Sequence, residues 1–391
     1  MDGLTVEGPR PGGDASGGTG GRPMTRRGVL SLAACAAGGV AGGCAGFPRE
    51  EARFAAAREE MRRLVQAGLF AGAVAADADG GPVLAEGLQC FLEKKVPMTA
   101  DSLCDLASVG KTFTASLCAQ LVAEGRLDPD APFTTYLPEH VLAKEKCRIT
   151  VRDLATHSGG FDNSKPYWAE RDPAVFLRKL YAKRPVRPRG EAFEYACSNF
   201  IYLGKIVEKL TGSDLDSAAR KRFWGPLGMT RTTWNPVRDD GRVVEFPPSS
   251  YAGTGTRRIG DHNDLACHVS PVPLGSGSAF STVGDMRLFA ADLLHRRRFP
   301  KAYYDLLFTP SFEKGGVRRS FGWDMPAERS KTQMTPDLVF SPATIAHSGW
   351  TGPAVVVDPE KGRAGVFLGN RTGDYLGSMR GRMKVLALLR G

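Results

Sequence analysis

A serine and a lysine stand three positions apart in the segment Ser108-Val109-Gly110-Lys111. If Ser108 begins a helix, Lys111 lies on the same face one turn later, within reach of the serine hydroxyl. A serine hydroxyl is a poor nucleophile unless a nearby base takes its proton, and a helix N-terminus favours negative charge on its oxygen. The spacing therefore predicts a nucleophilic serine. The same spacing recurs at Ser311 and Lys314, in a polar stretch where we expect no catalytic role.

The tripeptide Gly110-Lys111-Thr112 also resembles the end of a phosphate-binding loop. That loop needs a glycine five residues before Gly110, and this position holds Asp105. A carboxylate there would repel phosphate, so we reject nucleotide binding.

Two further segments contain residues that suit the chemistry of an activated serine. Tyr195 comes directly before an apolar helical pattern in 190–204, and His347 lies on a predicted strand that ends in glycines, Ala346–Gly352. Together with Ser108 and Lys111, these segments resemble the three motifs of the serine β-lactamase, penicillin-binding DD-peptidase and related carboxylesterase superfamily. They follow the family's order along the chain, and the resemblance covers roughly residues 50–391. Supporting similarity lies in three segments: 99–107, 149–160 and 277–286.

The resemblance implies a role for each reactive side chain. Ser108 attacks a carbonyl carbon and becomes an acyl-enzyme, while Lys111 keeps the site positive and shares protons with its neighbours. Tyr195 serves as general base and later activates the deacylating water. His347 stands where many relatives have lysine, and we expect it to orient the tyrosine or a substrate carboxylate.

The remaining implied site positions bind substrate. The backbone N–H groups of Ser108 and Trp350 form the expected oxyanion hole, and Gly349 permits the close approach of the two segments. Three positions are expected to contact substrate: Cys197, Ser348 and Gly349.

The chain departs from the family at its second motif, which is often Tyr-x-Asn. Here Cys197 occupies the asparagine position, unless Asn199 folds back to replace it. A thiol is a weak hydrogen-bond donor to a substrate carbonyl. This departure favours the hydrolysis of a small ester or amide over efficient β-lactamase or D-Ala-D-Ala peptidase activity. Two alternatives stay open: a DD-peptidase or β-lactamase, and a non-catalytic penicillin- or peptidoglycan-binding module.

Hydrophobic periodicity predicts the elements that must position these residues. Helical patterns run over 49–67, 108–124 and 375–389. Strand patterns lie near both ends of the chain, at 71–76, 83–86, 321–325, 344–346, 354–358 and 365–368. We therefore expect an α+β fold in which both termini form an antiparallel sheet flanked by helices. The sheet domain would comprise 48–125 and 266–391, and 126–265 would form an all-helical insertion, as in β-lactamases and transpeptidases.

Residues 1–47 are predicted to be a leader outside the fold. Arg26 and Arg27 precede a short Ala/Gly-rich apolar run, which is the layout of a twin-arginine export signal. The run is too short for a stable membrane span. The segment ending at Cys44 resembles a lipoprotein cleavage box with Ala in place of the usual Leu, which leaves an N-terminal membrane tether open. We expect an exported protein in the periplasm or at the cell surface.

Composition limits the remaining function classes. The 391 residues include 52 Lys and Arg against 42 Asp and Glu, a net charge of +10, but the basic residues are scattered and the longest run is 296–298. No nucleic-acid-binding motif accompanies them, so we expect no nucleic-acid partner. His262 and His268 lack metal-ligand spacing, and we expect no metal or cofactor. We expect a monomer that acts on a small ester or amide or on a cell-wall peptide.

Overall fold

The computed structural model describes residues 47–390 except 139–143, 168–169, 237–241, 247–258, 271, 333, 335–337 and 339. The predicted export signal and Cys44 lie outside these described residues. The described residues form one compact unit. The division of this unit into a sheet domain and a helical insertion at 126 and 265 stays a prediction.

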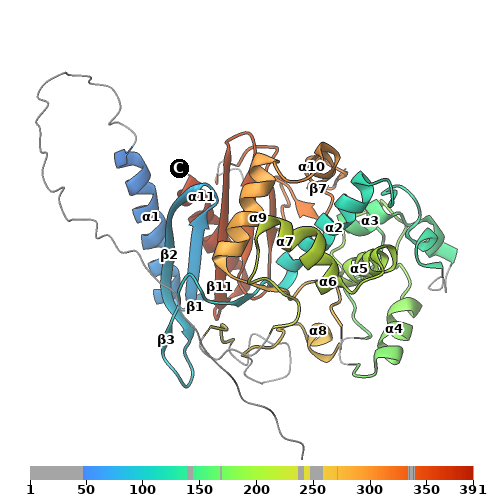
Figure 1. The fold of residues 1–391 in the computed structure, drawn as a ribbon, viewed down its shortest axis with the longest axis horizontal. Coiled ribbons are helices and arrows are strands. Elements are labelled where there is room, and N and C mark those ends of the chain that lie inside the picture. Colours follow the sequence, from blue (N-terminus) through green and yellow to red (C-terminus); the bar gives the residue numbers. More distant parts are fainter. Residues whose placement is uncertain are drawn as a thin grey trace, which may run out of the picture. The chain divides into compact units, whose positions relative to one another are not determined.

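Both ends of the chain contribute strands to one large antiparallel sheet, whose order is β3-β2-β1-β11-β10-β9-β8-β7-β6 (Figure 1). The N-terminal strand β1 (Phe70–Asp77) pairs with the C-terminal strand β11 (Arg363–Arg371) in the interior of this sheet. The α+β fold predicted from the sequence is confirmed. The other strands are β2 Gly80–Cys90, β3 Val96–Pro97, β6 Phe312–Lys314, β7 Val317–Ser320, β8 Trp323–Asp324, β9 Ile345–Ser348 and β10 Ala354–Asp358.

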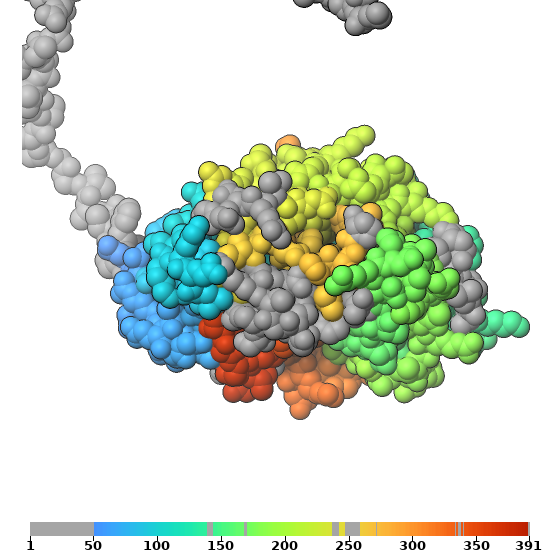
Figure 2. Space-filling model, turned by 90° about the horizontal axis from the view of Figure 1, so that it is seen from below, coloured from blue at the N-terminus to red at the C-terminus, as the bar shows by residue number. Residues whose placement is uncertain are grey.

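Successive residues of the central strands face opposite sides of the sheet, as the two-residue period of a strand requires. Along β10, Ala354 and Val356 pack with helices α1 (Phe47–Gln66) and α11 (Tyr375–Arg390), whereas Val355 and Val357 face the larger core that includes helix α9 (Val283–His295). Figure 1 shows α1 and α11 on one side of the sheet and α9 on the other. In Figure 2 the blue N-terminal part of this unit adjoins the red C-terminal part.

The regular elements that the structure describes between residues 126 and 265 are all helical. The longest is α5 (Cys197–Thr211), which begins two residues after Tyr195. The others before residue 265 are η2 Phe133–Thr135, η4 Lys144–Arg148, α3 Val151–Thr156, α4 Pro173–Ala182, α6 Leu215–Ala219, the π-helical turn η5 Arg220–Trp224 and α7 Gly225–Leu227. The remaining elements are α8 Leu265–Val269, α10 Lys301–Phe308 and a two-stranded sheet of β4 Cys104–Asp105 and β5 Phe280–Ser281.

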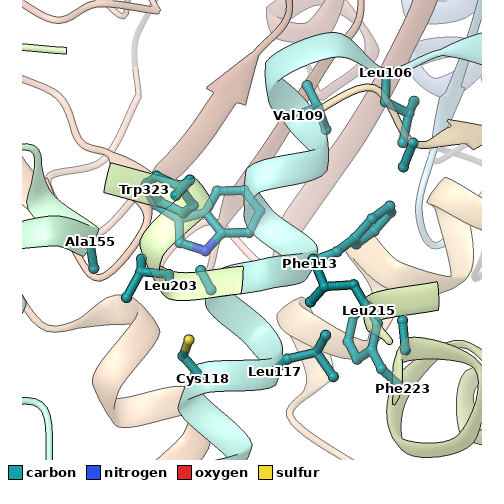
Figure 3. Close-up of a cluster of buried hydrophobic side chains, with 14 of the residues drawn as sticks. Leu106, Val109, Phe113, Leu117, Cys118, Ala155, Leu203, Leu215, Phe223 and Trp323 are labelled. Atoms are coloured by element: carbon teal, nitrogen blue, oxygen red, sulfur yellow. The ribbon is translucent and has the colours of Figure 1, made fainter. Parts of the chain in front are cut away.

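Helix α2 (Lys111–Ala123) passes through the larger hydrophobic core and is buried from Lys111 to Leu121 (Figure 3). A helix that is buried on every side must be surrounded by other elements of the fold. The Phe113 ring lies 5.3–5.8 Å, between centroids, from the rings of Phe223, Trp224 and Phe289. This packing fixes the helix that carries Lys111.

Some local expectations differ from the structure. Ser108 lies in a 3₁₀ turn, η1 (Ala107–Gly110), and α2 begins only at Lys111. The hairpin of β6 and β7 was not predicted, because its residues are mainly polar. The six cysteines that the structure describes are free, and five of them are buried. A search of the described helices finds none that is long and apolar enough to cross a membrane.

Candidate active site

A cavity of about 420 Å³ brings together five residues that the sequence analysis selected. The residues are Ser108, Tyr195, Cys197, Ser348 and Trp350, and they come from the η1 turn, the start of α5 and the end of β9. Lys111 lies directly behind Ser108. The second Ser-x-x-Lys pair does not line this cavity, because Ser311 and Lys314 lie at strand β6 on the edge of the sheet.

Lys111 is completely buried, and its ammonium group is hydrogen-bonded to Ser108 in the turn Ala107–Gly110, which we call the nucleophile turn. Its Nζ atom lies 3.2 Å from Ser108 Oγ and 3.8 Å from Cys197 Sγ, and it also donates to the carbonyl oxygen of Ser276. Burial disfavours the charge on Lys111, but the nearby Cys197 and Tyr195 groups favour it more, so its pKa is raised. Lys111 is therefore a cation in the resting site, rather than the free base that would take the Ser108 proton directly.

The backbone before Ser108 is held in an unusual conformation. Ala107 has φ +43°, a left-handed value that costs energy for a residue with a side chain. Its carbonyl oxygen accepts a 2.8 Å hydrogen bond from Ser278 N. A Cβ atom on Gly277 would lie 2.5 Å from the same carbonyl oxygen, and one on Gly349 would lie 2.5 Å from the carbonyl oxygen of Leu106. Only glycine permits both approaches, which brings the β9 end against the nucleophile turn.

Asp105 supports this turn from within the core. Its carboxylate accepts hydrogen bonds of 2.7 Å from Ala107 N and from Asn263 N, and its carbonyl oxygen accepts one from the Thr351 hydroxyl. The residue thus connects the nucleophile turn to two other walls of the site. Burial raises the pKa of Asp105 to about 7, although the two backbone donors oppose the shift.

This raised pKa predicts how the stability of the protein depends on pH. Between about pH 4 and 7 the folded protein holds a proton on Asp105 that the unfolded chain has released, so the free energy of unfolding falls as pH rises through this window. The contribution of this one group is at most about 1.4 kcal/mol per pH unit. We expect Asp105→Asn to remove it, so urea unfolding between pH 4.5 and 7.5 should give a flatter profile for the variant. Parallel profiles for the two proteins would contradict this prediction.

The Tyr195 ring is enclosed by cations and by a histidine. Lys111 Nζ lies 5.0 Å and Lys331 Nζ 3.2 Å from the ring centroid, and the His157 ring packs at 4.4 Å. The Tyr195 hydroxyl is buried and has no hydrogen-bond partner among the described residues. The lone pairs of this oxygen are therefore available to accept a proton.

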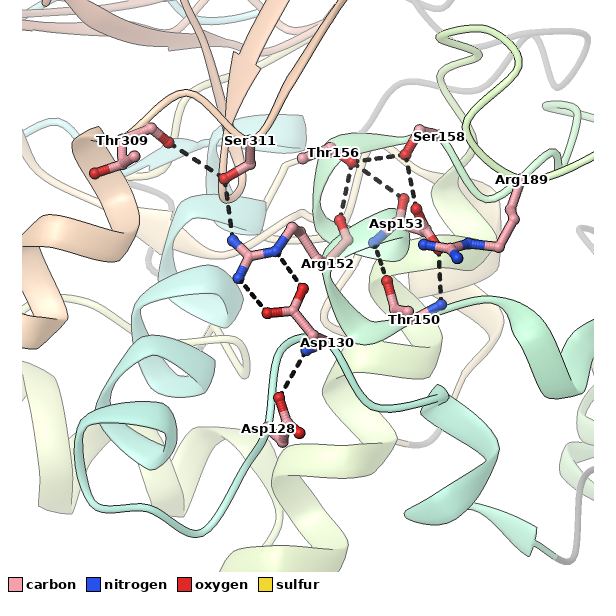
Figure 4. Close-up of polar contacts among 10 residues, drawn as sticks. All are labelled: Asp128, Asp130, Thr150, Arg152, Asp153, Thr156, Ser158, Arg189, Thr309 and Ser311. Atoms are coloured by element: carbon pink, nitrogen blue, oxygen red, sulfur yellow. Dashed lines mark hydrogen bonds and ion pairs between the residues drawn. The ribbon is translucent and has the colours of Figure 1, made fainter.

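His157 and the loop that follows it position Tyr195. His157 Nδ1 accepts hydrogen bonds from Ala196 N at 3.3 Å and from Asn199 Nδ2 at 3.0 Å. Figure 4 shows how the loop is attached to helix α3: Asp153 accepts from Thr150 N, from the Ser158 hydroxyl and from Arg189. Burial and nearby cations lower the pKa of His157 well below its ordinary value, so it is neutral.

Comparisons with known proteins identify the family of this chain. The family model described as Beta-lactamase matches residues 57–388. The chain belongs to the β-lactamase family. It is 27% identical to a putative D-alanyl-D-alanine carboxypeptidase of Escherichia coli (strain K12) over 72% of each chain, and 26% identical to an N-acetylmuramyl-L-alanine amidase of Bacillus subtilis (strain 168) over 69% of this chain and 68% of that one.

Solved structures show the same fold. A β-lactamase from Sulfitobacter sp. EE-36 superimposes with a TM-score of 0.68 and 21% identity over 87% of this chain and 97% of that one. A D-alanine carboxypeptidase from Burkholderia cenocepacia gives 0.68 and 20% over 87% and 98%. The protein is a serine hydrolase of the β-lactamase-related type.

The structure resolves the question that the second motif raised. Asn199 does not fold back into the cavity of this β-lactamase relative: it is buried, and its amide nitrogen is bonded to His157. The possibility that Asn199 replaces the missing asparagine is therefore wrong. Cys197 faces the cavity, and its backbone N–H donates to Asn163 Oδ1 at 3.3 Å.

His347 and Gly349 do not line the cavity, although Ser348 between them does. His347 Nδ1 lies 3.1 Å from the Ser348 carbonyl oxygen, and the described residues show no hydrogen bond from His347 to Tyr195. Burial, with Arg319 and Lys111 nearby, lowers the pKa of His347 well below its usual range. Its predicted orienting role stays a prediction, and this strand position contributes no positive charge.

Several cavity residues were missed by sequence reasoning. Lys165 lies 3.3 Å from Asp264 in an ion pair, and Lys331 projects from the segment between β8 and β9. The ring of Tyr375 stacks on Trp350 at 5.2 Å. None has a local motif, because loops from distant parts of the chain bring them together. Among the described residues, no group of three or more His, Cys, Asp or Glu side chains is arranged to hold a metal ion.

Proposed function

We propose that this protein is an exported acyl-serine hydrolase that cleaves a small ester or amide through an acyl-enzyme on Ser108. The observation that carries the proposal is the 3.2 Å contact between Ser108 Oγ and the buried Lys111 Nζ, at the wall of a cavity that also contains Tyr195. A nucleophile held beside a charged group and a potential base is the arrangement that covalent acyl transfer needs.

In the proposed cycle Lys111 stays positively charged. Tyr195, which must be ionised to act as the base, accepts the Ser108 proton as Oγ attacks the carbonyl carbon, and then passes the proton to the leaving group. The backbone N–H groups of Ser108 and Trp350 stabilise the oxyanion. Water then attacks the acyl-enzyme as Tyr195 accepts one of its protons, and Tyr195 passes this proton to Ser108 Oγ as the acyl C–O bond breaks, which releases the acid and restores both residues.

The substrate class is a small ester or amide, with a cell-wall peptide as the natural candidate. One of the relatives above is described as a putative D-alanyl-D-alanine carboxypeptidase, and another as an N-acetylmuramyl-L-alanine amidase. The predicted leader would deliver the enzyme outside the cytoplasm, where such peptides occur.

Trapping the acyl-enzyme tests this proposal. The full chain is mixed with p-nitrophenyl acetate, quenched at intervals, and analysed by intact mass and peptide mapping. We expect a burst of p-nitrophenol, steady turnover, and a transient acetyl adduct on the peptide that contains Ser108. A stoichiometric adduct that is never released would favour a penicillin- or peptidoglycan-binding module. Turnover with the adduct on another residue would contradict the proposal.

A further inference from the structure

A charged side chain is buried next to the end of β9, although the proposed cycle makes no use of it. Arg382 on α11 is completely buried, and no acidic side chain of the described residues forms an ion pair with it. Burial lowers the pKa of Arg382 to about 10, so the guanidinium stays charged at neutral pH. A buried charge without a counter-ion destabilises a fold, so stability alone does not account for this arginine.

The guanidinium is bonded to the segment that follows β9. Arg382 Nη1 donates a 2.9 Å hydrogen bond to the carbonyl oxygen of Gly349. Its Nη2 atom lies 2.8 Å from the sulfur of Met379, a weak acceptor, and its Nε atom has no hydrogen-bond partner among the described residues. The Gly349 carbonyl also accepts from Gly352 N, at 3.3 Å. The shorter and charge-assisted bond to this carbonyl therefore comes from Arg382.

The bonded carbonyl belongs to the same peptide group as the N–H of Trp350, which is the predicted oxyanion donor. A trans peptide group is planar and points its carbonyl and its N–H in opposite directions. A Gly349 carbonyl held toward Arg382 on α11 thus directs the Trp350 N–H away from that helix. Because Trp350 lines the same cavity as Ser108, the contact that orients the carbonyl also sets the direction of a donor beside the nucleophile.

The charge of Arg382 acts on this peptide group as well as its position does. A cation on a carbonyl oxygen draws electron density from the peptide, and hydrogen bonds that share one polar group strengthen one another, so the N–H becomes a stronger donor. We propose that Arg382 is a positioning residue of the oxyanion hole, which orients and polarises the Gly349–Trp350 peptide. This inference rests on the proposed function of Ser108 and adds a residue to that same reaction.

A second arginine shows what is particular to Arg382. Arg371 Nε donates to the carbonyl oxygen of Trp350 at 2.8 Å, and another of its nitrogens donates to the Gly373 carbonyl. The carbonyl of Trp350 belongs to the next peptide group, whose N–H is that of Thr351 and is not a predicted oxyanion donor. Both arginines fix this segment, but only the bond from Arg382 reaches the peptide that carries the donor.

The test measures acylation and deacylation separately on the full chain. With p-nitrophenyl acetate, kcat/KM reports formation of the acyl-enzyme, and decay of the acetyl adduct on Ser108 reports its hydrolysis. Both steps pass through a tetrahedral oxyanion, so we expect Arg382→Met to slow each by roughly 10- to 100-fold, less than the outright loss of an oxyanion donor costs. The burst amplitude, which counts folded active sites, should keep its wild-type value.

Phenylboronic acid adds a measurement that needs no turnover. Ser108 Oγ bonds to boron as the hydroxyl proton is released, and the tetrahedral anion places an oxygen in the oxyanion hole. Its inhibition constant should rise in Arg382→Met by the same factor by which acylation slows. Arg382→Lys keeps a cationic N–H donor and should recover most of the loss. Lys146→Met, which removes a buried cation from the Tyr181 carbonyl, controls for the loss of a buried charge.

The outcomes separate this inference from the proposed function. An unchanged inhibition constant in Arg382→Met, or an equal rise in Lys146→Met, would overturn the role of Arg382. A smaller burst amplitude with unchanged rate constants would assign Arg382 to the fold alone and would overturn it as well. Failure of the wild-type chain to form an acetyl adduct on Ser108 would instead contradict the proposed function.

Discussion

Replacing Ser108 with alanine is expected to reduce kcat for p-nitrophenyl acetate by about 10³-fold or more, because the hydroxyl that forms the acyl-enzyme is lost. The hydroxyl is the group that Lys111 holds at 3.2 Å, and alanine leaves the turn and the cavity otherwise intact. Alanine also fits the backbone of η1 without new contacts. Loss of activity should therefore occur without loss of fold, as judged by circular dichroism and the urea unfolding midpoint.

The chain contains its own matched control for this experiment. Ser311 has a lysine three residues later, as Ser108 does, but its hydroxyl accepts from Arg152 and donates to the Thr309 carbonyl at the edge of the sheet (Figure 4). We expect Ser311→Ala to retain wild-type kcat. If both variants lost activity equally, or if Ser108→Ala kept more than a tenth of it, Ser108 would not be the nucleophile.

Much of the fold was predictable because its signals are local. Strand β10 was predicted with the bounds that the structure shows, Ala354–Asp358, since an apolar run between turn residues is a strong strand signal. Strands β6 and β7 carry no such pattern. Arg319 is a strand residue that is 1% exposed, and it is stable there because Asp324 on the next strand neutralises it. A pairing across strands cannot be deduced from the residues of one strand.

The candidate site, like the fold, was predictable only where its residues belong to segments with a local sequence signal. Ser108, Lys111 and Tyr195 belong to segments with recognisable order and context, and the structure brings them together. The sequence analysis used Asp105 only as an argument against phosphate binding. In the structure its carboxylate accepts a hydrogen bond from Ala107 N and so stabilises the nucleophile turn. Lys331 had no motif at all. Its position depends on hydrogen bonds from its two neighbours to Asp324, a tertiary arrangement that sequence spacing does not encode.

Replacing Lys111 with methionine is expected to lower kcat/KM for p-nitrophenyl acetate by about 10³-fold. The free energy of unfolding should stay nearly unchanged or increase. The positive charge 3.2 Å from Ser108 Oγ, which stabilises negative charge developing near this oxygen, is lost, and such preorganised charge is commonly worth about 10²- to 10³-fold. Stability follows a different balance. Methionine leaves the Ser276 carbonyl without the Lys111 donor, but it also removes a completely buried ammonium whose desolvation is costly.

Lys146 provides a control for the loss of a buried lysine outside the active site. It is also completely buried, and its ammonium bonds to the Tyr181 carbonyl and, at 3.3 Å, to the Tyr202 hydroxyl, away from the cavity. We expect Lys146→Met to keep wild-type kcat/KM, whatever its effect on the urea midpoint. Activity of Lys111→Met within tenfold of wild type would contradict the role of Lys111. A loss of activity in Lys111→Met alone would show that the buried lysine beside Ser108 is retained for chemistry, because the fold does not require its charge.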